Sequence, residues 1–509
     1  AGSTFDVGGL ILTTNDIDTT GGLFGAGSTI RFRGVADRRA AVTIENGATI
    51  NALTNGSSYV GMVAPRVVQG GTVSVDGSAA YVAAEQADLT INNGLFDIAI
   101  AVGTTDANGV VHSGTTTGPS STPTFDVFGN PTAADAQAIY MVAVPKNDAL
   151  TMLVGGNLGY QPAASASVVN GNVVLSAGAD VATTGNQTNA SFAFDKQASV
   201  SDSNIQLQNV AFGSSVASFA TNGIIASTAS VTDFIVATNA VGTQNLLLEA
   251  RNRIDVNARG GGTMRANGNI TLRAGASGVG GTININADQV GFTDTITSGL
   301  IVAGDLLVDV GGTGLDDFFT VRNNGGTGIG QDAVGGQINV NISGGGDLVV
   351  GGAAQFIARA QGGKGENRNG SARGGTIGLA ISSGTFSVAG TTFFETRALS
   401  AQTLKIGGNA AGGVQSNDAT AGTFDLTVTG GSHTINDLTV SALADAGTGS
   451  FDATGNGISG FARAGGANFL VDAGSLAVNV DMDSNLSTYG IAPASAADRI
   501  ALTVRNGGT

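Results

Sequence analysis

One short segment has the residue types and the spacing of a calcium-binding motif. The segment GGTGLDDFF, residues 311–319, fits the nonapeptide GGxGxDxUx, with Asp316 at the acidic position and Phe318 as the large apolar residue. Glycines let the backbone turn so that carbonyl groups and the Asp carboxylate converge on Ca²⁺. Successive turns share the ion in such motifs, but the neighbouring GGTGIGQDA and GGKGENRNG lack Asp at the sixth position. The sequence therefore predicts Asp316 as a candidate calcium ligand, with a plain glycine-rich turn as the alternative.

Aspartate pairs are the candidates for acid–base catalysis, since polysaccharide lyases and hydrolases combine clustered carboxylates with Arg or Lys. The pairs are Asp16/Asp18, Asp316/Asp317 and Asp481/Asp483. Each pair is close to a turn, where Asp is favoured for local hydrogen bonding. Residues i and i+2 can share one face of a strand, so Asp481 and Asp483 are the best placed. Because no basic cluster accompanies them, we predict no catalytic residue and no enzyme.

The one basic cluster is RFRGVADRR, residues 31–39. We expect it to be a solvated loop near the amino-terminal coils, with a contact to a transporter or a polysaccharide as the alternative. Cysteine is absent and histidine occurs twice, which excludes disulfides, thiol nucleophiles and the usual zinc sites. His112 and His433 are expected to be ordinary surface residues. The segment GNGISG, residues 455–460, matches GxGxxG but precedes FARAGG instead of a helix, so no cofactor is predicted.

The net charge of the chain argues against one class of partner, the nucleic acids. It carries 22 Lys and Arg against 38 Asp and Glu, a formal net charge of −16. This field repels phosphate backbones, so nucleic acid is not an expected partner. No apolar run is long enough to span a membrane, and the first residues lack a signal-peptide pattern. We expect a soluble chain whose export signal has been removed or lies outside this sequence.

Alternating apolar residues predict short strands with one buried face. The segment TIGLAI places Ile377, Leu379 and Ile381 on one side, and QINVNI does the same with its apolar residues. Phenylalanines at positions 319, 356 and 394 recur at intervals of 37 and 38 residues. A repeat of this length indicates a solenoid or a propeller. The absence of Trp and the loose Gly/Ser/Thr/Asn connectors favour an all-β parallel β-helix, a β-solenoid rod with loop insertions.

The same repeat predicts how the coils are built. Two coils of about 19 residues would account for each interval, given the usual length of strands. The outward-facing residues Asn284, Asn286, Asn339 and Asn341 are then expected to stack in register as amide ladders. One coil cannot bury its apolar face alone, whereas stacked coils can.

Residues 5–101 carry a more specific pattern. The run FDVGGLILTTNDI is followed by AAVTIENGATINALTNGSSYVGMVAPRVVQGGTVSV, whose strongest part is residues 61–75. This region resembles the secretion domain of filamentous-haemagglutinin-like exoproteins of bacterial two-partner secretion systems. The resemblance implies a right-handed parallel β-helix in a secreted protein, recognised by a dedicated outer-membrane β-barrel transporter. The Asn-Pro motifs that the family carries upstream are absent, so no transporter-recognition residue is named.

We predict three segments: secretion-domain-like coils in residues 1–102, an insertion or extra-coil segment in residues 103–165, and a repetitive body in residues 166–509 that continues beyond Thr509. The expected function is that of a secreted, cell-surface structural exoprotein, an adhesin or biofilm-matrix fibre. It would bind cell-surface or polysaccharide ligands through many weak contacts, with divalent cations as possible bridges. Lateral self-association into filaments is compatible with exposed Thr and Asn faces. The alternatives are a stalk that delivers a carboxy-terminal toxin and a polysaccharide lyase or hydrolase.

Overall fold

The computed structural model describes the chain apart from residues 1, 21–27, 55–57, 93, 122–123, 130, 134–135, 163–170, 185–190, 197–201, 231, 239–242, 289–298, 314–329, 366–368, 401–416, 447–459, 479–481, 486–487, 490–498 and 506–509. The described residues form β-strands, turns and loops and no helix. None of them therefore belongs to a helix long and apolar enough to cross a membrane. The predicted all-β parallel β-helix is confirmed, because equivalent strands pair in parallel from one coil to the next.

The chain divides into two compact units, and unit 1 comprises residues 1–250 and 262–270. One set of its coil strands pairs in parallel with a register that continues across coils. These strands are β2 (Gly9–Thr13), β7 (Ser58–Ala64), β10 (Gly77–Ala83), β17 (Ala138–Ala143), β19 (Asn172–Ala177), β23 (Val216–Ala220) and β26 (Leu246–Ala250).

The remaining coil strands of unit 1 complete its parallel ladders. They are β1 (Thr4–Asp6), β5 (Ala41–Ile44), β6 (Thr49–Ala52), β8 (Arg66–Gln69), β9 (Thr72–Val75), β13 (Val110–His112), β14 (Thr115–Gly118), β18 (Leu150–Tyr160), β22 (Ser203–Phe212), β24 (Gly223–Thr228), β25 (Phe234–Ala237) and β28 (Thr263–Ala266).

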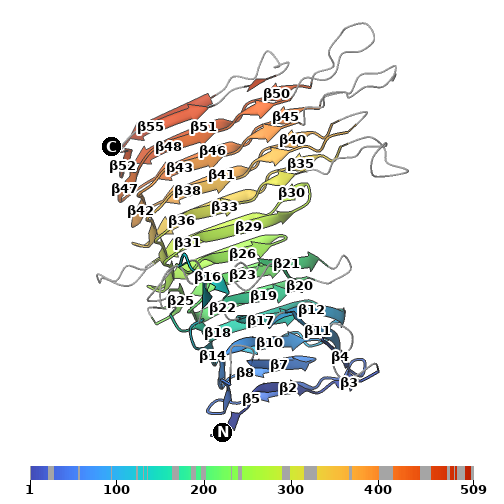
Figure 1. The fold of residues 1–509 in the computed structure, drawn as a ribbon. Helices are drawn as coiled ribbons and strands as arrows, with labels where there is room; N and C mark the ends of the chain where they lie inside the picture. Colours follow the sequence, from blue (N-terminus) through green and yellow to red (C-terminus); the bar gives the residue numbers. More distant parts are fainter. Residues whose placement is uncertain are drawn as a thin grey trace, which may run out of the picture. The chain divides into compact units, whose positions relative to one another are not determined.

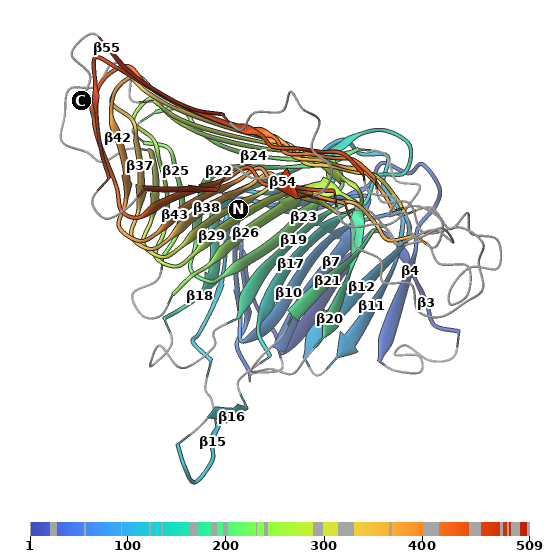
Figure 2. The ribbon, with the colours of Figure 1, turned by 90° about the horizontal axis from the view of Figure 1, so that it is seen from above.

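An antiparallel sheet lies beside the coils of unit 1 (Figure 2). Its strands are β3 (Asp16–Asp18), β4 (Thr29–Arg33), β11 (Gln86–Asn92), β12 (Leu95–Val102), β20 (Ala179–Thr184) and β21 (Ser191–Lys196). The sheet and the coils share one hydrophobic core, in which Phe32, Leu89 and Phe96 of the sheet pack with Val82 and Tyr140 of the coils. This antiparallel branch distinguishes unit 1 from a plain stack of coils.

The segment 103–165 contributes strands to the coils of unit 1. Strands β13, β14, β17 and β18 pair in parallel with their neighbours on both sides. A separate hairpin, β15 (Thr124–Phe125) and β16 (Pro131–Ala133), pairs only with itself among the described strands and stands away from the coils (Figure 2). The described coil strands of the segment are therefore part of the β-helix, and one hairpin projects from it.

Unit 2 comprises residues 251–261 and 271–509 and repeats one coil plan. Its first complete turns contain β27 (Arg253–Arg259), β29 (Ile270–Ala276), β30 (Val279–Gly280), β31 (Thr282–Asp288), β32 (Gly299–Val302), β33 (Leu306–Asp309) and β34 (Gly312–Thr313). The next turn contains β35 (Ala333–Val334), β36 (Gln337–Ser343), β37 (Asp347–Val350), β38 (Ala354–Ile357) and β39 (Ala360–Gln361).

The later turns of unit 2 follow the same order of strands. They are β40 (Ala372–Arg373), β41 (Thr376–Ile381), β42 (Thr385–Val388), β43 (Thr392–Glu395) and β44 (Ala398–Leu399), then β45 (Ala419–Thr420), β46 (Thr423–Val428), β47 (Ser432–Ile435), β48 (Leu438–Ser441) and β49 (Ala444–Asp445), then β50 (Ala462–Arg463), β51 (Gly466–Asp472), β52 (Ser475–Val478), β53 (Met482–Asn485), β54 (Thr488–Tyr489) and finally β55 (Arg499–Arg505). Equivalent strands such as β31, β36, β41, β46 and β51 lie one above the other (Figure 1).

The predicted coil length is wrong. Phe356 and Phe394 are direct register partners on β38 and β43, so the 38-residue interval between them is one coil and not two coils of about 19 residues. The coil is longer because each turn contains several short strands separated by corners and loops. The first member of the repeat, Phe319, lies outside the described residues.

The core of unit 2 changes in width within each coil. At the wide part, the inward alternating residues are large, and they include Ile338, Phe356 and Phe394. At the narrow part, the core is a cluster of buried alanines: Ala333, Ala360, Ala372, Ala398, Ala419, Ala421, Ala442, Ala444, Ala446 and Ala462. Small side chains at those positions allow the two walls of the coil to approach each other.

Candidate functional site

Asp316, Asp317 and Asp481 lie outside the described residues, so the calcium ligand stays a prediction. Asp483 lies on β53, where its backbone pairs with Thr439 of β48.

The other aspartate pair meets the basic cluster. Strands β3 and β4 are antiparallel, so Asp16 lies opposite Arg33 and Asp18 lies opposite Arg31. Arg33 forms an ion pair with Asp88 of β11, with Nη1 2.6 Å from Oδ1. The predicted loop is therefore wrong for residues 31–33, which belong to strand β4. The reason is the alternation in TIRFR, whose Ile30 and Phe32 are buried in the shared core.

Both histidines are buried, which corrects the expectation that they are surface residues. His112 is 2% exposed and His433 is 1% exposed. His112 Nδ1 lies 2.7 Å from the Gly155 carbonyl oxygen, and its Nε2 lies 2.9 Å from Thr116 Oγ1, which also contacts the Tyr81 hydroxyl. Since the carbonyl can only accept, Nδ1 carries the proton. Burial lowers the pKa of His112 to about 4, so the ring is neutral at pH 7.

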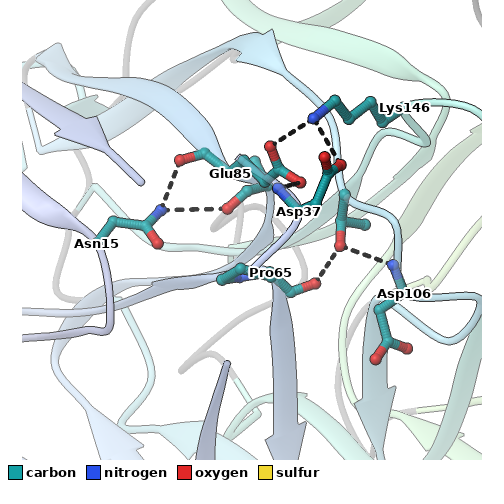
Figure 3. Close-up of polar contacts among 8 residues, drawn as sticks. Asn15, Asp37, Pro65, Glu85, Asp106 and Lys146 are labelled. Atoms are coloured by element: carbon teal, nitrogen blue, oxygen red, sulfur yellow. Dashed lines mark hydrogen bonds and ion pairs between the residues drawn. The ribbon is translucent and has the colours of Figure 1, made fainter. Parts of the chain in front are cut away.

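A connected polar site of unit 1 is a group that we call the Lys146 clamp, formed by Lys146, Glu85 and Asp37 (Figure 3). Lys146 Nζ lies 2.9 Å from Glu85 Oε2 and 2.9 Å from Asp37 Oδ1. The Asp37 backbone N–H donates to Glu85 Oε1 at 2.9 Å. The Glu85 side chain is 1% exposed, whereas that of Asp37 is 69% exposed. The clamp thus joins three chain segments around one buried carboxylate.

Backbone contacts extend the clamp on both sides of Glu85 (Figure 3). Asn15 Nδ2 donates to the carbonyl oxygens of Ala84 and Glu85 at 3.1 and 3.0 Å. The Thr104 hydroxyl donates to the Pro65 carbonyl at 2.6 Å and accepts from the Asp106 N–H at 3.0 Å. Glu85 follows β10 and directly precedes β11. The network therefore holds the point where the chain leaves the coil for the antiparallel sheet.

The clamp is suited to structure and not to catalysis. The hydrogen bonds that Lys146 donates to the Asp37 and Glu85 carboxylates raise the pKa of Lys146, so its amine stays protonated near pH 7 and is neither a base nor a nucleophile. Each carboxylate oxygen of Glu85 accepts a hydrogen bond, Oε1 from the Asp37 backbone N–H and Oε2 from Lys146 Nζ. A buried carboxylate with a cation and a backbone N–H is stabilised, whereas the same carboxylate without its cation is costly.

Lys146→Met is expected to lower the free energy of unfolding, because it leaves the buried Glu85 carboxylate without its cation. Urea unfolding followed by circular dichroism measures the change. The double variant Glu85→Gln/Lys146→Met removes both charges and should recover most of the loss. The raised pKa means that the contribution of Lys146 is present below the ordinary lysine pKa and is lost as pH rises through the folded-state value. A single variant as stable as the wild type would contradict this assignment.

The outer face of unit 2 carries a second ordered polar feature, which we call the outer polar ladder: Asp255, Asn257, Asn284, Asn286, Asn339 and Asn341 on β27, β31 and β36. Asn339 Nδ2 donates to Asn284 Oδ1 at 2.9 Å, and Asn284 Nδ2 donates to Asp255 Oδ1 at 2.7 Å. The parallel column from Asn341 through Asn286 to Asn257 has distances of 3.1 and 2.8 Å. The predicted amide ladders are therefore confirmed.

A third polar feature lies on β43 and the residues that follow it. The Glu395 side chain is 7% exposed, and its Oε1 lies 3.9 Å from Arg397 Nη1. Burial raises the pKa of Glu395, while the nearby Arg359 and Arg397 oppose the rise and Asp309 adds to it. No group of three or more His, Asp or Glu residues that could hold a metal ion occurs within the described ranges.

Sequence reasoning missed the Lys146 clamp. Its carboxylate and ammonium lie 61 residues apart, and Asp37 lies 48 residues from Glu85. No local periodicity connects such positions. The signal that could have drawn attention to them is the scarcity of lysine in this acidic chain. Lys146 also directly follows Pro145, shortly after the end of the apolar strand β17 at Ala143.

Comparison with known proteins adds no family assignment. The chain matches no protein-family model, and neither the curated proteins nor the solved structures yield a match.

Proposed function

We propose that the chain is a secreted, cell-surface-associated exoprotein of the filamentous-haemagglutinin-like class, acting as an adhesin or biofilm-matrix fibre. Its contacts are multivalent and non-catalytic. The observation that supports this proposal is the outer polar ladder, in which three consecutive coils present polar side chains, five amides and one carboxylate, in register. A polymer or a cell surface that meets such a face makes many weak contacts at once, and these sum to strong attachment.

The chemistry of the described polar groups also favours a non-catalytic role. The Lys146 ammonium is held by two carboxylates, and His112 is buried and neutral at pH 7. An acid–base site instead needs groups that are accessible and able to change protonation state.

The partner that we propose for export is an outer-membrane transporter of a two-partner secretion system. The support is the resemblance of residues 5–101 to the secretion domain of that class. For ligands we propose cell-surface groups or polysaccharide, with divalent cations as bridges between the acidic chain and anionic polymer. Lateral association of coils into filaments is part of the same proposal.

The test compares attachment of cells that produce the chain with cells from which its gene has been removed. Attachment should fall when the chain is absent and return when the purified full chain is added back, with heat-unfolded chain as the control. Protease treatment of intact cells should cleave the chain, because we place it outside the cell. Unchanged attachment, or a chain that protease cannot reach, would contradict the proposal.

Cation bridging has its own test. Addition of a chelator should release the chain from the cells or from isolated polysaccharide, and excess Ca²⁺ should restore binding. Binding that is insensitive to the chelator would remove the bridging element and would leave direct contacts as the mechanism.

A further inference from the structure

One wall of unit 2 carries two outward columns of side chains at the narrow end of the coils. The strands β35, β40, β45 and β50 pair in parallel there, with Ala333, Ala372, Ala419 and Ala462 in register (Figure 1). The residues before these alanines form the first column, Asp332, Ser371, Asp418 and Phe461, and the residues after them form the second, Val334, Arg373, Thr420 and Arg463. Because the alanines are buried, the two columns face outward.

A pocket of about 280 Å³ opens on this wall and is lined by Asp418, Thr420, Phe461 and Arg463. The backbone N–H of Phe461 donates to Asp418 Oδ1 at 2.9 Å, which holds the carboxylate beside the ring. The same contact occurs two coils earlier, where the Ser371 N–H and hydroxyl donate to Asp332 Oδ1 at 2.8 and 2.7 Å. The Asp side chain is thus repeated on the wall, at Asp332 and Asp418. Of these two, only Asp418 has an aromatic neighbour in the first column, Phe461.

Two features of the pocket point to a ligand. Phe461 is 55% exposed, whereas Phe394 and Phe424 of the neighbouring coils are fully buried. Arg463 is exposed and forms no ion pair with any described residue, in a chain where acidic residues outnumber basic ones. The exposed Phe461 ring would gain free energy by being covered, and the Arg463 guanidinium, which has no carboxylate partner among the described residues, is available to bind an anion.

The side chains that line the pocket indicate which chemical groups a ligand must have. A guanidinium binds a carboxylate with two parallel hydrogen bonds. The Asp418 carboxylate and the Thr420 hydroxyl accept hydrogen bonds from hydroxyl groups, and the Phe461 ring offers an apolar face for C–H groups. A hexuronate, which is a sugar ring with one carboxylate, supplies all three. A purely acidic peptide supplies the carboxylate but places further negative charge beside Asp418.

The spacing of the wall suits a polymer. Neighbouring coils lie about 4.8 Å apart, so Arg373 and Arg463, two coils apart, are about 10 Å apart along the stack. We propose that this pocket binds one residue of an acidic, hexuronate-containing glycan, and that the glycan chain runs along the wall toward Arg373. The assignment rests on the proposed function and names its ligand class.

The experiment is isothermal titration calorimetry of the full chain with a galacturonate oligosaccharide of defined length and with a neutral glucose oligosaccharide as the comparison. Arg463→Ala is expected to weaken galacturonate binding about tenfold, because one charge-assisted bidentate contact is lost. Phe461→Ala should weaken it severalfold. Arg265→Ala, which removes another exposed arginine from strand β28 of unit 1, is the matched control and should bind as the wild type does. Added salt should weaken binding.

Three results would overturn the proposal. The first is galacturonate binding that is equal in the wild type and in Arg463→Ala. The second is equal binding of the neutral oligosaccharide or of a poly-glutamate peptide. The third is no galacturonate binding at all. Because Phe461 and Arg463 are exposed, their truncation leaves the core intact, and unchanged unfolding curves confirm this. If cells lose attachment when the chain is absent but the purified chain does not bind galacturonate, the pocket assignment is wrong and the proposed function still stands.

Discussion

Phe394→Ala is expected to lower the free energy of unfolding by about 4 kcal/mol, because it removes a fully buried ring and leaves a cavity. Phe394 stacks on Phe356 of the previous coil, with ring centroids 4.9 Å apart and an angle of 17° between the planes. Across the core it contacts Phe424 at 4.4 Å, and Phe424 in turn contacts Phe469 at 5.5 Å. The ring therefore joins two walls and successive coils, and urea unfolding followed by circular dichroism measures its contribution.

The matched control is the next residue toward the amino terminus. Phe393 lies on the same strand, β43, but faces outward and is only partly buried. Phe393→Ala should cost less than about 1 kcal/mol, because the ring already contacts water. Equal losses in the two variants would show that the inward and outward faces of β43 have been assigned wrongly.

Gly375→Ala is expected to lower the free energy of unfolding by about 3 kcal/mol through a steric clash between coils. A Cβ atom at Gly375 would lie 1.9 Å from the carbonyl oxygen of Gly336 in the previous coil. The relation repeats along the stack: a Cβ at Gly422 would lie 1.6 Å from the Gly375 oxygen, and one at Gly465 would lie 1.8 Å from the Gly422 oxygen. Backbone from adjacent coils is in contact at this corner, so any side chain must push the coils apart.

Gly378→Ala is the control for that clash. Gly378 lies three residues further along, on β41, and a Cβ there would have its nearest neighbour, Asn339 Oδ1, at 3.9 Å. Alanine should be neutral or stabilising by about 0.5 kcal/mol, since glycine within a strand carries an entropic cost. If Gly375→Ala unfolds at the same urea concentration as Gly378→Ala, the close approach of the coils at Gly375 is wrong.

The local part of the fold could be predicted because it depends on a period of two. Ile377, Leu379 and Ile381 alternate with smaller residues, and the structure buries all three on one side of β41. The amide ladders followed from the same alternation, since in-register parallel strands place like residues above one another. In these cases the interactions that determine the structure are formed within one strand and between that strand and its neighbour.

The coil length and the clamp could not be predicted, because they depend on contacts between distant residues. The interval between repeated residues gives the length of the repeat in the sequence. It does not say whether the strands within one repeat form one coil or two. Phe356 and Phe394 revealed one coil only when their register was seen. Lys146 and Glu85 meet across 61 residues because the chain leaves the coil for the antiparallel sheet and then returns.

The histidines illustrate a related limit. Residue type predicts exposure only on average, and a polar side chain is buried where it has partners for its hydrogen-bonding groups. The Gly155 carbonyl and the Thr116 hydroxyl supply them for His112. For His433, the Gly430 carbonyl and the Phe386 N–H do so. Gly155 and Phe386 belong to neighbouring coils, so these two partners could not be identified from the sequence without the register of the coils.

The central claim is that the chain attaches by many weak, non-catalytic contacts, and surface plasmon resonance tests it most directly. The full chain is passed over polysaccharide from the producing cells, immobilised at increasing density. We predict that the apparent Kd falls steeply as the density rises and that the eluted polysaccharide keeps its length. A Kd that is independent of density, or polysaccharide that is shortened by the chain, would contradict the account.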